Sequence, residues 1–245
     1  MDVLILGGGY GKRLFGAYDP DTYYPKGLVQ ISGRPCIEHI LDAFSDGLIS
    51  RVILETNREG EAHYRNWLKK SRLADKTEIF VEEVSSPDNC LGVLETIDIV
   101  SRHYQFKRPI LIVSPDNIFI RKQDGLVTGY TEGARIAIYK LEYLEDAKKY
   151  GVVEVELDKI ISCIEKPLRP QSRIIRTSCE IWDESVFHLL SRWNSSFNSD
   201  KVGDFINYLI TNEINVESYE TSGLWIDIGN EQDLEKAKMM VGLRA

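Results

Sequence analysis

Glycines and two cationic side chains follow the first apolar run of the chain. The stretch LILGGGYGKRLFGAYDPDTYYPKGLV has glycine at positions 7, 8, 9 and 11, with Arg13 and Lys26 thirteen residues apart. Glycine lets a backbone approach a ligand closely or adopt positive φ. Backbone N–H groups in such a loop bind phosphates, and arginine and lysine side chains neutralise them. The stretch indicates a phosphate site, although a tight turn without a ligand fits the glycines about as well.

The spacing of the loop can be compared with two common phosphate-binding motifs. A dinucleotide-binding GxGxxG needs a third glycine, but Lys12 or Leu14 stands there in the two registers that can be tried. A Walker A loop needs serine or threonine after Gly-Lys, and this chain has Arg13 in that place. The spacing therefore excludes both motifs.

Carboxylates suited to a divalent cation occur at two distant places. Asp116 follows the apolar segment LIVSP, at the expected carboxyl end of a strand, where open α/β sheets bind ligands. Asp227 lies within the apolar segment GLWIDIG, where an aspartate is costly to bury unless it pairs or binds a metal. The plainer interpretations are a turn residue at Asp116 and a helix cap at Asp227, although Asn230 is the better placed N-cap.

The elements that must position these residues alternate in the first part of the chain. Apolar runs predict strands, and apolar residues at a period of 3.6 predict helices. Strands are predicted at 2–6, 51–56, 77–83 and 109–114, and helices at 35–44, 60–70 and 91–104. This alternation predicts right-handed βαβ units.

The second part of the chain is richer in strands. Strands are predicted at 134–141, 151–157, 159–166, 173–182 and 214–220, and helices at 142–149, 184–193, 202–212 and 231–241. A hairpin turn is predicted over 156–160. We predict an α/β fold in one domain, residues 1–245. It has a Rossmann-like mixed, mainly parallel sheet with helices on both faces and a smaller antiparallel part.

Composition limits the class of partner. The net charge of −8 argues against a nucleic-acid backbone as a ligand, because such binding needs a surface rich in lysine and arginine. No apolar run approaches the length of a membrane span, and no secretory leader is expected. The four cysteines form no CxxC pair, which is typical of reduced, buried thiols in a cytoplasmic protein.

Several motifs together resemble the sugar-1-phosphate nucleotidyltransferase family, whose fold is GT-A-like. The glycine loop has the family's Gly-Gly-x-Gly-x-Arg-Leu form, followed by Pro25-Lys26. Tyr-Gly-Val-Val at 150–153, Glu-Lys-Pro at 165–167 and Trp-x-Asp-x-Gly at 225–229 also match. The matches keep the family's order along the whole chain. Departures are Ser114-Pro115 in place of Leu-Gly, and Ser178 in place of glycine.

The resemblance implies a role for each matching residue. Arg13, Lys26 and Lys166 would be catalytic, and Asp116 and Asp227 would bind Mg²⁺. The implied nucleotide-binding residues are Leu6, Gly8, Gly9, Gly11, Lys12, Glu83 and Gly92, mainly in a half formed by 1–133. The implied sugar-phosphate-binding residues are Gly151, Glu165, Lys166 and Thr177, in a half formed by 134–245.

The reaction implied is transfer of a nucleotidyl group from dTTP or UTP to glucose 1-phosphate, giving an NDP-sugar and pyrophosphate. Alternatives are a mannose-1-phosphate guanylyltransferase, a CTP-dependent cytidylyltransferase acting on an alcohol phosphate, and a non-catalytic paralogue that binds a nucleotide sugar. The expected partners are small molecules, neither nucleic acid nor membrane. Family members often form homo-oligomers, but the sequence identifies no interface. The base and the sugar are also left open.

Overall fold

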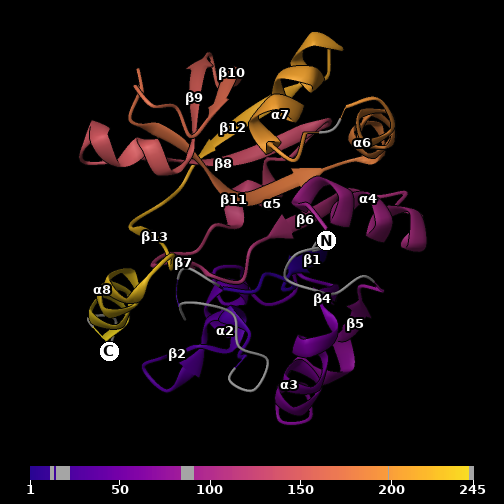
Figure 1. The fold of residues 1–245 in the computed structure, drawn as a ribbon, viewed down its shortest axis with the longest axis vertical. Helices are drawn as coiled ribbons and strands as arrows, with labels where there is room; N and C mark the ends of the chain where they lie inside the picture. Colours follow the sequence, from indigo (N-terminus) through magenta and orange to yellow (C-terminus); the bar gives the residue numbers. More distant parts are fainter. Residues whose placement is uncertain (12–13, 15–22, 84–90, 198, 243–245) are drawn as a thin grey trace. The chain divides into compact units, whose positions relative to one another are not determined.

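The chain folds into two compact units, neither of which is continuous in sequence. The computed structural model describes residues 1–11, 14, 23–83, 91–197 and 199–242 (Figure 1). The first unit comprises Met1–Cys90, Val113–Asp124 and Ser222–Ala245. The second comprises Leu91–Ile112 and Gly125–Thr221.

The first unit contains a parallel ladder of three strands. These are β1 (Asp2–Leu6), β4 (Arg51–Thr56) and β5 (Thr77–Val81), in the order β5-β4-β1. The middle residues of β1 and β4 are fully or almost fully buried and apolar, as expected for parallel strands covered on both faces. Helix α3 (Arg58–Leu68) follows β4 directly, and its N-cap Asn57 accepts a hydrogen bond from Gly60 N at 2.7 Å.

A second, antiparallel ladder in the same unit joins β7 (Asn117–Phe119) to β13 (Trp225–Asp227). It brings together two segments more than a hundred residues apart, with Asp227 opposite Asn117. The remaining elements of the unit are η1 (Lys26–Leu28), β2 (Gln30–Ile31), β3 (Arg34–Pro35), α2 (Cys36–Leu41), η2 (Ala74–Lys76) and α8 (Glu231–Gly242).

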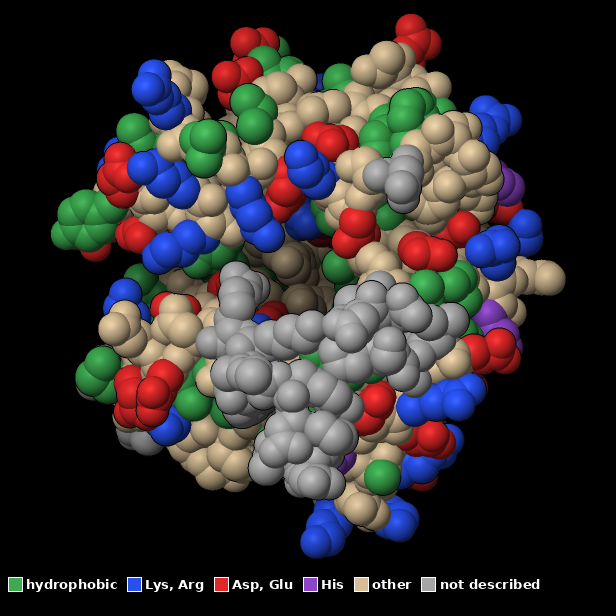
Figure 2. Space-filling model, viewed as in Figure 1, with side chains coloured by type: hydrophobic (Ala, Val, Ile, Leu, Met, Phe, Trp, Pro, Cys, Tyr) green, Lys and Arg blue, Asp and Glu red, His purple; other side chains and the backbone are tan. Residues whose placement is uncertain are grey.

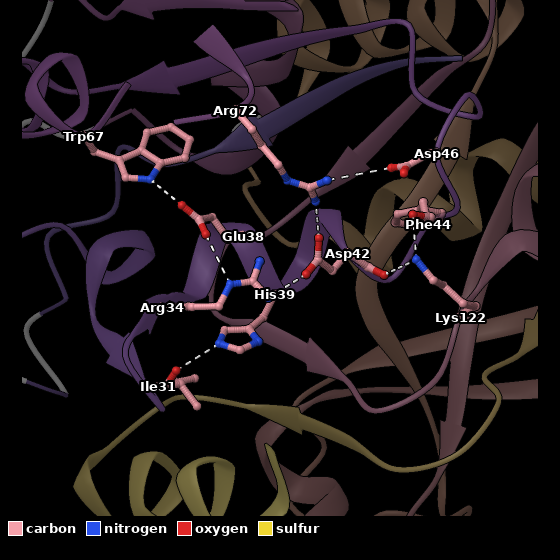
Figure 3. A network of polar contacts seen from close by, with 10 residues as sticks. All are labelled: Ile31, Arg34, Glu38, His39, Asp42, Phe44, Asp46, Trp67, Arg72 and Lys122. Carbon is pink, nitrogen blue, oxygen red and sulfur yellow. Dashed lines mark hydrogen bonds and ion pairs between the residues drawn. The ribbon is translucent and has the colours of Figure 1, made fainter. Parts of the chain in front are cut away.

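A network of polar contacts ties the segment after β7 to the end of α2 (Figure 3). Lys122 Nζ donates to the carbonyl oxygens of Asp42 and Phe44, at 2.7 and 3.0 Å. The Asp42 carboxylate in turn pairs with Arg34 and Arg72. Exposed ion pairs of this kind contribute little each, and the link to the chain that follows β7 is made by the two hydrogen bonds of Lys122.

The second unit contains a larger ladder that is mostly antiparallel. Its strands run in the order β6-β11-β8-β12-β10-β9, and β11 also pairs with β9. Their bounds are β6 (Ile110–Val113), β8 (Ala134–Lys140), β9 (Gly151–Glu156), β10 (Lys159–Glu165), β11 (Ile174–Trp182) and β12 (Val216–Glu220). Strand β6 ends at Val113, where the chain returns to the first unit.

Aromatic side chains fill the core of the second unit. The ring centroid of Trp182 on β11 lies 5.5 Å from that of Phe205, and the ring centroid of Trp193 lies 5.9 Å from that of Phe205. The helices and 3-10 turn of this part are α4 (Val93–Tyr104), α5 (Asp124–Thr128), η3 (Leu144–Lys149), α6 (Glu184–Ser196) and α7 (Val202–Thr211). Helix α7 packs against β10, and Asn207 on α7 exchanges two hydrogen bonds with the backbone of Cys163.

The α/β fold predicted from the sequence is confirmed, with parallel strands early in the chain and mainly antiparallel strands later. The predicted helix over 35–44 is too long, since α2 ends at Leu41 and turns follow. The predicted helix over 142–149 is a 3-10 turn that begins at Leu144. None of the helices in the described ranges is long and apolar enough to cross a membrane.

Candidate functional site

The glycine loop after β1 is held from one side by β4 and α3. Gly7 N donates to the backbone oxygen of Glu55 at 2.9 Å, and Gly8 N donates to Glu55 Oε2 at 3.2 Å. Asn57 Nδ2 donates to Gly8 O at 2.7 Å. The first turn of the loop is therefore fixed by the residues that end β4.

The structural reason for a glycine differs from one position of the loop to the next. A Cβ on Gly7 would lie 2.7 Å from Glu55 O, and one on Gly8 would lie 2.3 Å from Glu55 Oε1. Gly11 has φ of 63°, which favours glycine. A Cβ on Gly9 would meet nothing within 4 Å. The packing of the described residues thus explains Gly7 and Gly8 but not Gly9, which is exposed.

A pocket of about 250 Å³ lies beside this loop within the first unit. Its lining joins three segments, and consists of Leu6, Gly7, Gly9, Gly11, Lys26, Ser114, Pro115 and Asp116. Gly27 allows the third segment to approach η1, because a Cβ there would lie 3.0 Å from Pro115 Cβ. Glycine backbone therefore lines this pocket together with one lysine and one aspartate.

Lys26 and Asp116 form an ion pair at the edge of this pocket. Lys26 Nζ lies 2.9 Å from Asp116 Oδ2 and also donates to Ile228 O at 3.1 Å. The two side chains are only 13% and 15% exposed. Proline 25 begins the 3-10 turn that carries Lys26, so the lysine leaves a rigid piece of backbone. A cation is thereby held next to the glycine loop.

Asp227 is brought to the same end of the unit by the β7–β13 ladder. Ile228 N donates to Asp116 O at 3.0 Å, so the residue after Asp227 is hydrogen bonded to the backbone of Asp116. Asp116 precedes β7 and Asp227 ends β13, and two such carboxylates suit Mg²⁺, which usually takes one or two carboxylates and completes its shell with water and substrate phosphates. No group of three or more metal-binding side chains occurs among residues that the structure describes.

Cys36 is the thiol nearest to this cluster. Burial, with a smaller contribution from the Asp116 charge, raises its pKa to about 12. The thiol is therefore protonated at neutral pH and is no nucleophile. It belongs to an apolar cluster with Val29 and Ile228.

In the second unit, Gly151 lies opposite Glu165 on the β9–β10 ladder. A Cβ on Gly151 would lie 3.0 Å from the Arg176 side chain and 3.2 Å from Glu165 Oε2. Glu165 Oε2 and Arg176 Nε are both buried, and neither has a hydrogen-bond partner among the described residues. One hydrogen-bond acceptor and one donor, each without a partner among the described residues, therefore lie next to Gly151.

Arg176 is paired on its other side with Glu180. Arg176 Nη1 lies 2.8 Å from Glu180 Oε1, and Trp182 Nε1 donates to Glu180 Oε2 at 3.0 Å. Burial raises the pKa of Glu180, and the arginine charge opposes this effect. The register of the β11–β8 ladder shifts between Arg176 and Glu180. This bulge places the two side chains together.

Two predicted sugar-side residues adjoin this group. Lys166 is exposed and follows β10 with φ of 46°, an uncommon conformation for a residue other than glycine. The Thr177 hydroxyl is buried and donates to Ala137 O at 2.9 Å, so its proton is already in use. Only its lone pairs and its backbone are available for a ligand.

The packing of Asp200 explains why residue 92 is a glycine. A Cβ there would lie 2.3 Å from the carboxyl group of Asp200, which accepts a hydrogen bond from Leu94 N at 3.1 Å. Asp200 thus caps the start of α4. Burial raises the pKa of Asp200, and its hydrogen bonds with the backbone oppose this shift.

The structure brings Leu6, Gly8, Gly9, Gly11, Lys26, Asp116 and Asp227 together in the first unit, and Gly151, Glu165, Lys166 and Thr177 in the second. Arg13 and Lys12 lie outside the described residues. Glu83 is exposed just beyond β5. Sequence reasoning missed Glu55, Asn57 and Arg176. A glutamate ending the apolar run RVILET was the one available signal.

A family model described as nucleotidyl transferase matches residues 2–242. UTP–glucose-1-phosphate uridylyltransferase AglF of Haloferax volcanii is 23% identical over 97% of this chain and 95% of its own length. A mannose-1-phosphate guanyltransferase of Debaryomyces hansenii is 26% identical over 95% of this chain, which spans 62% of that relative.

Solved structures share the fold. A UDP-glucose pyrophosphorylase complexed with UDP-glucose superposes with a TM-score of 0.78 at 17% identity, covering 100% of this chain and 99% of that chain. At this level of identity the likeness concerns the fold.

Proposed function

Since the chain belongs to the nucleotidyl transferase family, we propose that it transfers a nucleotidyl group from an NTP to a sugar 1-phosphate and releases pyrophosphate. The observation that carries this proposal is the cluster of Lys26, Asp116 and Asp227 beside the glycine-loop pocket. It combines a cation, two carboxylates and backbone N–H donors, which is what binding of a polyphosphate with a divalent cation requires.

The bond that forms joins an oxygen of the sugar 1-phosphate to the α-phosphorus of the NTP. The bond that breaks joins the α-phosphorus to the oxygen bridging to the β-phosphate, and pyrophosphate leaves with that electron pair. The attacking phosphate is already ionised at neutral pH, so no general base is needed. The rate then depends on positioning and on stabilisation of the charge that develops.

Lys26 is placed to stabilise charge on the α-phosphate. Its ammonium group contacts Asp116 and Ile228 O and has a third N–H for a phosphate oxygen. Asp116 and Asp227 would hold Mg²⁺, which would screen the phosphates and polarise the α-phosphorus when bound. Arg13, by its place in the motif, is proposed to bind the leaving phosphates in a bidentate manner.

The second unit is proposed to bind the acceptor. Glu165 Oε2 can accept from a sugar hydroxyl, and Arg176 Nε can donate to another oxygen of the ring. Gly151 lets both groups pack against the backbone, because a Cβ there would crowd them. Lys166, exposed at the end of β10, is proposed to bind the 1-phosphate.

For the substrates we propose glucose 1-phosphate with UTP or dTTP. Similarity to a uridylyltransferase that covers nearly the whole of both chains supports this choice. Mannose 1-phosphate with GTP is the second candidate, supported by similarity to a guanyltransferase. Residues 84–90, which precede Gly92, lie outside the described residues.

The test is a panel of four NTPs, UTP, dTTP, CTP and GTP, against glucose, mannose and amino-sugar 1-phosphates, with Mg²⁺, scored for pyrophosphate. Inositol 1-phosphate and phosphocholine with CTP are included for the cytidylyltransferase alternative. One strongly preferred sugar pair is expected. Turnover with CTP and an alcohol phosphate only would overturn the sugar assignment. Nucleotide-sugar binding without pyrophosphate release from any pair would favour the regulatory alternative.

A further inference from the structure

Glu55 lies directly beneath the glycine loop, although no motif of the sequence includes it. We propose that Glu55 is a positioning residue for the NTP, which in its neutral, protonated form anchors Gly8 and keeps negative charge away from the bound phosphates. This inference rests on the function proposed above, since it takes the glycine-loop pocket to be the nucleotide site.

The geometry connects Glu55 to the pocket through Gly8. Glu55 is 2% exposed, and Gly8 N donates to its Oε2 at 3.2 Å. Gly7 and Gly9, on either side of Gly8, both line the pocket. The orientation of the Gly8 peptide therefore sets the direction of the loop N–H groups next to it.

The surroundings of the other carboxyl oxygen, Oε1, favour the neutral form of Glu55. Glu55 Oε1 is buried, and the side chain that faces this carboxyl group is another carboxyl group, that of Glu82, which can share a hydrogen bond with it only if one of the two is protonated. A negative charge there would be poorly compensated, which is costly in a buried site. Burial, followed by the charge of Glu82 just beyond β5, raises the pKa of Glu55 well above its ordinary value.

The groups that face Glu55 come from three elements. The N–H groups of Gly7 and Gly8 after β1 favour the ionised form, whereas Glu82 after β5 opposes it. Tyr64 on α3 donates to Gly7 O at 3.5 Å, and burial, with the Glu55 charge among the smaller causes, raises its pKa. Tyr64 is thus a neutral neighbour. Burial and Glu82 therefore favour the protonated form of Glu55, and the two N–H groups oppose it.

Binding of an NTP would add several negative charges to the pocket. If the protonated form binds better, the pKa of Glu55 rises further in the complex, and binding takes up protons. Affinity is then greatest below the pKa of Glu55 in the free protein and is lost as the pH rises through it. Ionisation of the nucleotide itself affects all variants equally.

The experiment is calorimetric titration of the wild type, Glu55→Gln, Glu55→Ala and the control Glu78→Gln with the NTP that the wild type binds most tightly, between pH 6.5 and 9. Glu78 is an exposed carboxylate on β5 that pairs with Arg51 at the surface. Two buffers of different ionisation enthalpy report proton uptake. Thermal melts establish that each variant is folded.

We expect wild type and Glu78→Gln to lose affinity with rising pH on the order of tenfold more than Glu55→Gln. Glu55→Gln should bind within about twofold of wild type at the lowest pH, because the amide has the shape and the neutral charge of a protonated carboxyl group. It should also take up fewer protons. Glu55→Ala should bind weakly at every pH, because Gly8 loses its partner.

Parallel pH profiles and equal proton uptake in wild type and Glu55→Gln would overturn the inference while leaving the proposed function intact. Wild-type affinity in a folded Glu55→Ala would do the same. A wild type that binds none of the four NTPs would instead overturn the proposed function, together with the ligand assumed here.

Discussion

The Lys26–Asp116 ion pair is the contact on which the proposed chemistry depends most. Replacing Lys26 with alanine removes the only cation that lines the described pocket, and should lower pyrophosphate release on the order of a hundredfold to a thousandfold at saturating substrates. Asp116→Asn should be similarly impaired, because it loses a charged oxygen ligand for Mg²⁺. Initial rates of pyrophosphate release, measured across Mg²⁺ concentrations, test both.

Lys122→Ala is the matched control for the lysine. The Lys122 side chain also donates to backbone oxygens within the first unit, but it is exposed and does not line the pocket. Its turnover should equal that of the wild type. Normal turnover in a folded Lys26→Ala would contradict the proposed role of the lysine.

The glycines of the loop should separate folding from binding. Gly7→Ala pushes a Cβ against the backbone oxygen of Glu55, and should destabilise the protein by about 1–3 kcal/mol. Gly9→Ala meets no neighbour and should unfold like the wild type, yet raise the KM for NTP by obstructing the approach of phosphate to the backbone. Urea denaturation and initial rates measure the two effects. Equal effects of both variants on KM and stability would contradict this division.

At the residue scale, the sequence motifs identified the charged groups of the candidate site but not the contacts that hold them. Lys26, Asp116 and Asp227 stand out because polar residues within apolar or glycine-rich segments are conspicuous. Glu55 and Arg176 do not, because their importance arises from buried contacts with residues distant in sequence, such as Gly8 and Gly151. Those contacts exist only once the chain has folded.

At the scale of elements, the β9–β10 hairpin carries an avoidable strain. Its two turn residues, Leu157 and Asp158, have φ of 48° and 63°, and Leu157 is 97% exposed. Two-residue hairpin turns with positive φ favour Asn-Gly. The double variant Leu157→Asn, Asp158→Gly should raise the free energy of unfolding by about 1 kcal/mol and the Tm by about 2–4 °C.

Thermal and urea denaturation test this prediction, and activity should not change. Glu156 and Lys159 pair across the turn and are left intact, so the register of the hairpin is kept. An unchanged or lowered unfolding free energy would show that the turn is not strained. The variant also reports whether the hairpin that carries Glu165 tolerates a stiffer turn.

The bounds of strands and helices are predicted accurately where the sequence pattern is clear. Strands β1 and β4 agree with their predicted bounds, because continuous apolar runs next to glycine or asparagine are unambiguous. Strands β7 and β13 were not predicted, since each has three residues and is stabilised by a partner over a hundred positions away. The N-cap at Asn230 was predicted correctly, as its Oδ1 accepts from Asp233 N at 3.0 Å.

At the scale of the whole molecule, both proposed substrates and the protein are anionic. The net charge is −8, and Figure 2 shows acidic and basic side chains intermixed over the visible described surface. Long-range attraction therefore cannot concentrate the substrates at the protein. Local groups must do so, which gives a few lysines and arginines a disproportionate effect on affinity.

The assignment of one substrate to each unit makes a prediction about amide hydrogen exchange. An NTP with Mg²⁺ should protect residues 7–11 and 114–116 in the first unit. A sugar 1-phosphate alone should protect the β9–β10 hairpin near Gly151 and Glu165. Protection reflects the loss of local opening when a ligand binds the closed form.

Glu165→Gln should abolish only the protection by the sugar 1-phosphate, and Lys26→Ala should weaken only the protection by the NTP. Protection of the hairpin by the NTP, and of the glycine loop by the sugar phosphate, would reverse the assignment.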